Sequence, residues 1–169
     1  MVRIRKLDQT DATTIARLLN NKKIWDNLRD YIPFPYTESD ANNFISMVSK
    51  EEPQQTFGIE ADGLLCGAIG LVLPGDVYQK TGELGYWLGE PFWGQGIITE
   101  AIRLITIYGF EQFNLERMYA AVFEYNKASM KVLEKNGYIL EGISRNAIYK
   151  NNKLFDEYRY ALLKKEHKL

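Results

Sequence analysis

A junction between a strand and a helix, marked by two closely spaced glycines, constrains this 169-residue chain more than any other feature. Leu88 ends an apolar stretch, Gly94 and Gly96 follow, and apolar residues at helical spacing begin directly afterwards. Glycine allows a backbone to turn sharply and to approach a ligand without an intervening side chain. The first turn of a helix also presents unpaired N–H groups at the positive end of the helix dipole. The sequence therefore predicts an anion-binding turn between a strand and a helix.

Three phosphate-binding motifs share this geometry, and two of them fit poorly. A P-loop requires Gly-Lys followed by Ser or Thr, whereas Gly96 is followed by two isoleucines, which excludes that motif. A dinucleotide fingerprint requires a third small residue and an acid at the end of the next strand. Here the third position is Thr99, and the nearest acid, Glu116, precedes the next strand, which disfavours a dinucleotide-dependent oxidoreductase. An ordinary glycine-rich helix start without a ligand stays open beside the third motif.

The overall composition excludes several classes of protein. Lys and Arg number 21 and Asp and Glu number 22, so the net charge is -1, and a dedicated nucleic-acid-binding protein would be strongly basic. No window approaches the roughly 18 apolar residues that a transmembrane helix requires. No apolar stretch follows the first basic residues, so we expect no signal peptide. We therefore expect a cytoplasmic protein without nucleic-acid or membrane partners.

Histidine and cysteine are almost absent from the chain. The only histidine is His167, two residues before the end, and the only cysteine is Cys66, within an apolar stretch. Nucleophilic catalysis by serine or cysteine needs a well-held imidazole, and a zinc site needs several such ligands. We therefore expect no metal and no covalent enzyme intermediate of the usual kind. Cys66 is expected to be a small buried residue, and one cysteine forms no disulfide framework.

The periodicity of apolar residues predicts alternating strands and helices. A first strand is expected over Val2–Leu7, followed by one helix carrying Ile15, Leu18 and Leu19 and by another that opens at Thr37 or Ser39. The later elements are expected as strands 56–61, 64–73 and 81–88, a helix 96–113, a strand 118–123, a helix 127–135, and strands 138–148 and 154–163. Asp62-Gly63 predicts a tight hairpin. This order predicts an α+β fold with a three-layer α/β/α arrangement. Its central sheet is mixed and mostly antiparallel, with about six or seven strands and about four helices.

The third motif is carried by residues on both sides of the turn. Trp93-Gly94-Gln95-Gly96-Ile97-Ile98-Thr99-Glu100-Ala101 closely resembles the pyrophosphate loop of the GCN5-related N-acetyltransferases (GNAT), in their RimJ/RimL-like branch. Further segments resemble the same branch in the same order: Pro35–Ala41, Glu83–Leu88, Asn126–Ser129, Lys135–Tyr138, Glu141-Gly142 and Asn152–Tyr158. The resemblance covers nearly the whole chain. One departure is Pro91, which stands where the wider superfamily often has Gln or Arg.

The resemblance implies a single N-acetyltransferase domain over residues 1–169 with the acyl-CoA N-acyltransferase fold. It implies acetyl-CoA as co-substrate and direct transfer to a primary amine, without an acyl-enzyme. The implied cofactor-binding residues are Trp87, Leu88, Trp93, Gly94, Gln95, Gly96, Ile97, Ile98, Thr99, Asn126, Ser129 and Lys131. For Lys131, as for Lys127 and Lys135, a solvated basic helix face is the competing interpretation.

The resemblance also names candidates for the chemistry. Glu83 is the candidate general base; alternatively it is an ordinary strand residue. The superfamily's frequent tyrosine acid is replaced here by Leu133, and Ser129 occupies the position of the acid proposed for the RimL-like branch. Serine is also favoured near helix starts, so proton donation and helix capping both stay open for Ser129. Asn126 is expected both to cap the helix and to bind the pantetheine arm.

The acceptor amine is the least constrained part of the prediction. Tyr31, Phe34 and Tyr86 are candidates for an acceptor pocket, with Tyr36 and Trp93 beside them, although most aromatic side chains lie in protein cores. The resemblance implies a protein N-terminal α-amine or a small-molecule amine. A non-catalytic acyl-CoA-binding regulatory domain is the alternative function. We expect a monomer or a homodimer.

Overall fold

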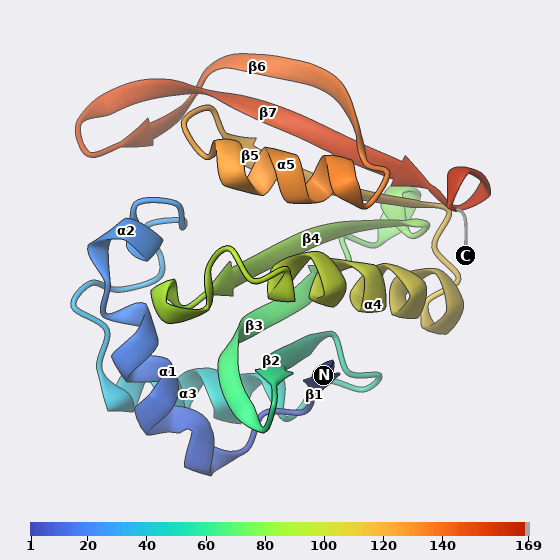
Figure 1. The fold of residues 1–169 in the computed structure, drawn as a ribbon. Coiled ribbons are helices and arrows are strands. Elements are labelled where there is room, and N and C mark those ends of the chain that lie inside the picture. Colours follow the sequence, from blue (N-terminus) through green and yellow to red (C-terminus); the bar gives the residue numbers. More distant parts are fainter. Residues whose placement is uncertain (168–169) are drawn as a thin grey trace. The chain divides into compact units, whose positions relative to one another are not determined.

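The computed structural model describes residues 1–167 and contains one seven-stranded sheet with the strand order β1-β2-β3-β4-β5-β7-β6 (Figure 1). β4 and β5 are parallel, whereas the ladders β1–β2, β2–β3, β5–β7 and β6–β7 are antiparallel. The strands are β1 Val2–Arg5, β2 Thr56–Ala61, β3 Leu64–Val72, β4 Thr81–Leu88, β5 Arg117–Phe123, β6 Ile139–Lys150 and β7 Lys153–Leu163. The helices are α1 Ala12–Leu19, α2 Lys22–Trp25, α3 Glu38–Val48, α4 Ile97–Gln112 and α5 Lys127–Lys135. The predicted α+β class with a mixed sheet is confirmed.

The chain forms two compact units. The first contains Met1–Gly70 and Tyr86–Ala101, and the second contains Leu71–Gly85 and Ile102–Leu169. β4 and α4 each have residues in both units. The expectation that residues 1–169 act as one N-acetyltransferase domain stays a prediction.

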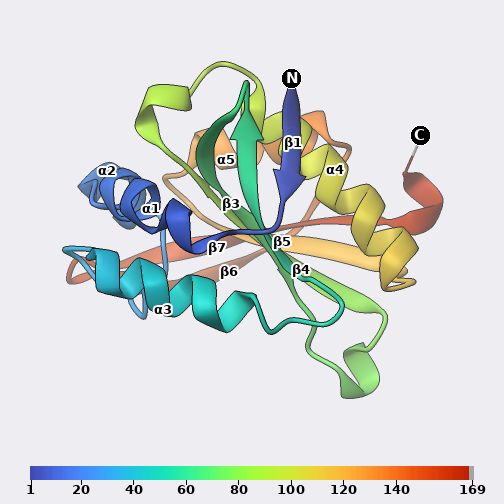
Figure 2. The same cartoon turned by 90° about the horizontal axis from the view of Figure 1, so that it is seen from below.

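In the first unit, α1 and α3 bury the faces that their sequences predict. Ile15, Leu18 and Leu19 of α1 and Ala41, Ile45 and Val48 of α3 are all less than 8% exposed. Figures 1 and 2 both show the two helices beside each other. Of the two predicted start residues of α3, Thr37 is the cap, because its side chain accepts a hydrogen bond from the N–H of Asp40. This capping box satisfies donors that the helix leaves unpaired.

The helix α2 was not predicted. It has four residues, Lys22–Trp25, and is capped by Asn21, whose side chain accepts from the N–H of Lys23. A single turn is too short to show the repeat of apolar positions on which the prediction of helices rests. The first strand also ends at Arg5, two residues earlier than predicted.

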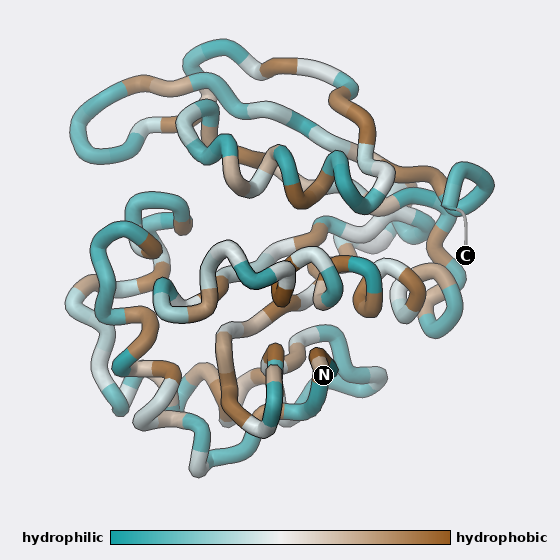
Figure 3. Tube along the Cα trace, viewed as in Figure 1, coloured by the Kyte–Doolittle hydropathy of each residue, from teal (hydrophilic) through white to brown (hydrophobic). Residues whose placement is uncertain are grey.

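The central hairpin of the first unit follows the prediction. Asp62 and Gly63 have φ values of 49° and 82°, which is the left-handed conformation that a two-residue hairpin turn requires. In Figure 3 most of β3 is coloured as hydrophobic, and Cys66 is fully buried there, as expected. A Cβ atom at Gly67 would lie 2.2 Å from the carbonyl oxygen of Trp87. Only glycine therefore permits this close approach of the backbones.

In the second unit, β5 alternates strictly between buried and half-buried residues. Met118, Ala120 and Val122 form its buried face, as expected for a strand with one face against the core. The β6–β7 hairpin turns at Asn151 and Asn152, both with left-handed φ values. Its tip is coloured as hydrophilic in Figure 3.

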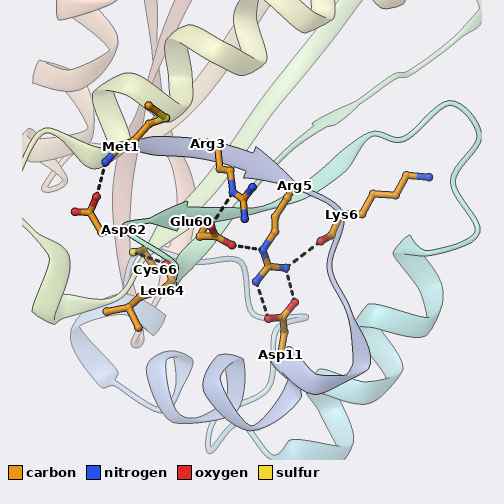
Figure 4. Close-up of polar contacts among 9 residues, drawn as sticks. All are labelled: Met1, Arg3, Arg5, Lys6, Asp11, Glu60, Asp62, Leu64 and Cys66. Carbon is orange, nitrogen blue, oxygen red and sulfur yellow. Dashed lines mark hydrogen bonds and ion pairs between the residues drawn. The ribbon is translucent and has the colours of Figure 1, made fainter.

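An ion-pair network ties β1 to the start of the first helical segment (Figure 4). Arg5 donates two hydrogen bonds of 2.8 Å to the carboxylate of Asp11, and its Nε donates to Glu60 at 2.6 Å. Arg3 donates to the other oxygen of Glu60 at 2.7 Å. Asp11 and Glu60 are less than 9% exposed. Hydrogen bonds from Arg5 lower the pKa of Asp11, because they favour the charged carboxylate.

This pKa shift predicts a pH-dependent contribution to stability. A carboxylate whose pKa is lowered by folding stabilises the protein above its unfolded pKa and loses that contribution as the pH falls through its folded pKa. We expect Asp11→Asn to lower the free energy of unfolding at pH 7 by about 1–3 kcal/mol, since it removes charge-assisted hydrogen bonds. The difference from the unmodified protein should shrink as the pH falls below about 4. Urea unfolding at several pH values measures it, with the exposed Glu52→Gln as control; a difference that is independent of pH would contradict the prediction.

Candidate active site

The predicted anion-binding turn lies in the first unit, where β4 passes into α4 through a 3₁₀ turn, Glu90–Phe92. Gly94 and Gly96 have φ values of 74° and 77°, and α4 begins at Ile97. A Cβ atom at either glycine would meet nothing within 4 Å. Glycine is therefore required by the left-handed backbone and not by crowding. The space above both residues is open to a ligand.

Two side chains of the turn fold back onto its backbone. The indole Nε1 of Trp93 donates to the carbonyl oxygen of Leu88 at 2.8 Å, and Nε2 of Gln95 donates to the carbonyl oxygen of Pro91 at 2.9 Å. Pro91 thus takes part in the turn through its carbonyl group. These two bonds fix the path of the backbone without using its N–H groups as donors. The N–H groups of the first helical turn have no carbonyl partner within their own helix and point out of its N-terminus.

The entrance to the turn is held by a charged contact. Glu90 accepts a hydrogen bond of 2.6 Å from Nδ2 of Asn21 and forms an ion pair with Lys23. Both contacts lower the pKa of the Glu90 carboxyl group, and the hydrogen bond from Lys23 has the larger effect. Beside it lies a cavity of about 580 Å³ lined by Arg17, Leu18, Asn20, Asn21, Glu90 and Pro91. The start of the turn is therefore anchored to the start of α2.

The other predicted cofactor residues of this unit differ in burial. Ile97 is 6% exposed and Leu88 is 8% exposed, whereas Trp93 is 44% exposed. Ile98 and Thr99 are half-buried. Trp87 is half-buried and packs against the core of the first unit. The exposed residues of the turn are thus those nearest the two glycines.

The second predicted cofactor segment is the start of α5 in the second unit. The side-chain oxygen of Asn126 accepts a hydrogen bond of 3.2 Å from the N–H of Ser129, so the expected capping by Asn126 is confirmed. Its amide nitrogen is not used by this bond. Ser129 is half-buried, and Lys131 is exposed. Lys127 lies over the ring of Tyr158, with Nζ 5.0 Å from the ring centroid.

Glu83 lies on β4 in the second unit and is half-buried. Its Oε2 accepts a hydrogen bond of 3.3 Å from the hydroxyl of Tyr119. The ladder between β4 and β5 contains three residue pairs, the last of which is Glu83 with Tyr119. Tyr119 was missed from sequence, because no pattern in the chain shows which residue of β5 stands opposite Glu83.

The aromatic candidates for an acceptor pocket fall into different environments. Tyr31 is 79% exposed and Phe34 is 40% exposed, with the ring of Phe34 5.5 Å from that of Trp25. Tyr86 is half-buried. Tyr36 is 7% exposed and belongs to the core of the first unit, so it contributes to stability and not to an open surface.

Residues 2–139 match the acetyltransferase (GNAT) domain family. The chain belongs to this family. Among relatives, the chain is 34% identical to the "Putative ribosomal N-acetyltransferase YdaF" of Bacillus subtilis, over 98% of this chain and 92% of that protein. It is 25% identical to spermidine N(1)-acetyltransferase of Escherichia coli, over 95% of this chain and 83% of that protein. The predicted GNAT membership is confirmed.

Solved structures agree with the family assignment. A GNAT acetyltransferase from Bacillus anthracis has a TM-score of 0.84 and 26% identity, covering 98% of this chain and 96% of that chain. The microcin C7 self-immunity acetyltransferase MccE, solved with acetyl-CoA and AMP, has a TM-score of 0.81 and 25% identity, covering 96% and 92%. RimL, solved with coenzyme A, shares the fold at 21% identity with a TM-score of 0.84, covering 96% and 93%.

These comparisons establish the chain as an N-acetyltransferase enzyme with the RimJ/RimL-type fold. The predicted class of enzyme is confirmed, and the comparisons provide no support for the non-catalytic alternative. Among residues 1–167, no helix is both long and apolar enough to cross a membrane. A cytoplasmic location stays a prediction.

The capping geometry of α5 yields a prediction about stability. Asn126→Ala should lower the free energy of unfolding by about 1 kcal/mol, since it removes the acceptor for an N–H group at the helix start. Asn126→Asp should restore most of that loss, because aspartate is an equally good cap and its charge suits the helix N-terminus. Chemical unfolding of the three proteins measures this. Equal stability of the alanine variant and the unmodified protein would show that the cap contributes nothing.

Proposed function

We propose that residues 1–169 act as a single N-acetyltransferase domain that transfers an acetyl group from acetyl-CoA directly to a primary amine. The observation that carries this proposal is the turn with left-handed Gly94 and Gly96 directly before the 16-residue helix α4. Its open backbone suits an anion, and MccE, a related structure, holds acetyl-CoA. Membership of the GNAT family supports the same co-substrate.

The pyrophosphate is proposed to bind the backbone of the turn at residues 93–99, through the N–H groups of residues 94–99, since the N–H of Trp93 donates to the carbonyl oxygen of Glu90 at 3.1 Å. Two phosphate groups need several donors, and the first turn of α4 supplies them together with the favourable end of the helix dipole. The side chains of Trp93 and Gln95 are already hydrogen-bonded to the turn itself, so they shape the site without covering the glycines. Trp87 and Leu88 are proposed to contact the pantetheine arm, and Lys131 the phosphate groups.

The transfer requires three chemical tasks. The amine must lose a proton, and we assign Glu83 as the general base that accepts it, directly or through water. The amine nitrogen then bonds to the thioester carbon, the carbon–sulfur bond breaks, and the electron pair leaves on sulfur. We assign Ser129 as the donor that protonates the thiolate. The CoA thiol has a thiol-like pKa of about 8.5, so its thiolate is a stable leaving group and protonating it is not demanding.

The acceptor is proposed to be the α-amine of a protein N-terminus, with a small-molecule amine as the second candidate. An α-amine with a pKa of about 8 is easier to deprotonate than an alkyl amine of about 10. The 34% identity to a protein whose name contains "ribosomal" supports the first, and the 25% identity to a spermidine acetyltransferase supports the second. Tyr31, Phe34 and Tyr86 are proposed to contact the acceptor, since two of them are exposed and the third is half-buried.

The first prediction from this proposed function concerns cofactor binding. Gly96→Ala should weaken acetyl-CoA binding by at least about tenfold, because a methyl group stands where the anion approaches the backbone and the left-handed conformation becomes unfavourable. Gly75→Ala is the matched control, since Gly75 has a φ of 76° and the same open surroundings but lies outside the turn. Isothermal titration calorimetry gives both dissociation constants. Equal affinities would mean that the turn does not bind the pyrophosphate.

The second prediction concerns turnover. The protein should release free thiol from acetyl-CoA with at least one member of a panel of N-terminal peptides and polyamines. Glu83→Gln should lower kcat by about 100-fold, since general base catalysis contributes roughly that much, and should leave acetyl-CoA affinity unchanged. The exposed Glu111→Gln is the control. Acetyl-CoA binding without thiol release from any acceptor would instead support a non-catalytic domain.

Asn126→Asp separates the two proposed roles of Asn126. The variant keeps the helix cap but replaces the amide nitrogen by a second carboxylate oxygen. A loss of acetyl-CoA affinity at unchanged stability therefore reports a contact of the amide with the cofactor.

A further inference from the structure

Two cavities of the first unit share the side chain of Arg17. Arg17 lies on α1 and is exposed, whereas the neighbouring Leu18 is buried. The larger cavity, of about 580 Å³, adjoins the 3₁₀ turn at Glu90 and Pro91. The smaller one, of about 250 Å³, adjoins the same turn at Phe92. Arg17 lines both, so its guanidinium group is accessible from either cavity.

The two carboxylates that line these cavities already have cationic partners. Asp11, in the smaller cavity, accepts two hydrogen bonds of 2.8 Å from Arg5, a pair that Figure 4 shows. Glu90, in the larger cavity, forms an ion pair with Lys23 and accepts a hydrogen bond from Asn21. The charge of each carboxylate is thus balanced by a cation beside it.

Arg17 differs from these groups, because none of residues 1–167 forms an ion pair or a hydrogen bond with its guanidinium group. The other cation of the lining, Arg5, is paired with both Asp11 and Glu60. The side-chain amide of Asn20, in the larger cavity, also has no hydrogen-bond partner within the described part of the chain. The lining therefore carries a positive charge and an amide group that are open to a ligand.

This pair of groups is suited to an oxyanion. Arginine presents its N–H donors in a planar fork that matches two oxygens of a carboxylate or a phosphate group, and an asparagine amide can donate a further hydrogen bond. Apolar walls complete the lining, with Leu18 in the larger cavity and Leu64 and Phe92 in the smaller one. The larger cavity has the size of a small-molecule site.

We propose that Arg17 and Asn20 form a binding site for a small organic anion. The carboxylate or phosphate group of the ligand is held by the guanidinium and amide groups, and its apolar part lies against the cavity wall. The site is separate from the turn at Gly94 and Gly96, and neither Arg17 nor Asn20 takes part in the proposed acetyl transfer. It therefore adds a second ligand to the protein and does not rest on the proposed function.

The test is an NMR titration of the isotope-labelled protein with benzoate, phenyl phosphate and benzamide. Both anions should bind with a dissociation constant of about 5 mM or tighter, and the tighter of the two identifies the acidic group of the natural ligand. Benzamide has the shape of benzoate without its charge, so it should bind at least about fivefold more weakly. The amide signals of Arg17 and Asn20 should move more than those of Gly94 and Gly96.

Variants of two arginines locate the site independently. Arg17→Gln should weaken the binding of both anions at least about tenfold, because it removes the charge and the planar fork, and Arg17→Lys should lose less than that. Arg145→Gln is the matched control, since Arg145 is also exposed but lies on β6, outside both cavities. It should leave anion binding unchanged. The melting temperature of Arg17→Gln should match that of the unmodified protein, since surface substitutions of this kind have small effects on stability.

Several results would overturn the inference. These are a lack of anion binding at about 20 mM, equal affinity for benzamide and benzoate, and an equal loss in the Arg17→Gln and Arg145→Gln proteins. Signals that move only at Gly94 and Gly96 would place the anion at the glycine turn and would also overturn it. None of these results bears on the affinity for acetyl-CoA, which Gly96→Ala tests separately.

Discussion

The left-handed backbone at Gly94 and Gly96 is the constraint on which the candidate active site depends. Two residues with φ near 75° within three positions allow the chain to leave β4 and enter α4 after one short 3₁₀ turn. Most other residue types would be strained in that conformation. Trp93 precedes Gly94, and Gln95 lies between the two glycines. The side chains of both residues donate hydrogen bonds back to carbonyl groups of the turn. The path of the turn is thus fixed by side-chain bonds to its carbonyl groups and not to its N–H groups.

Most of the fold follows from short-range patterns in the sequence. β4 and α5 have the predicted bounds, because each is strongly patterned and ends at a glycine or an asparagine. β6 ends two residues later than predicted, since it is exposed at nearly every position and has two irregularities in its register with β7. Such a strand shows no alternation to predict. α2 was not predicted for a similar reason, because its single turn is too short to show a repeat of apolar positions.

The candidate site was predictable to the extent that it is local in the chain. The turn around Gly96 and the cap at Asn126 each consist of neighbouring residues, so their spacing carries the prediction. Tyr119, which donates a hydrogen bond to Glu83, lies 36 positions away, and its identity depends on which residue of β5 pairs with which residue of β4. That register is set by packing over both strands. Glu83 therefore appeared in the sequence as an isolated carboxylate, and its hydrogen bond with Tyr119 could only be found from the structure.

In the proposed function, the backbone binds the cofactor and side chains select the acceptor amine. A cofactor that binds main-chain N–H groups requires a particular backbone conformation of the protein, and a few glycines are enough to provide it. This explains why Pro91 is compatible with the turn although related enzymes often have Gln or Arg there: its carbonyl group, which every residue possesses, accepts the bond from Gln95. An acceptor amine is instead chosen by side chains whose identity can change without altering the fold. Exposed residues such as Tyr31 are under little packing constraint. Specificity for the amine is therefore the property that a shared GNAT fold determines least.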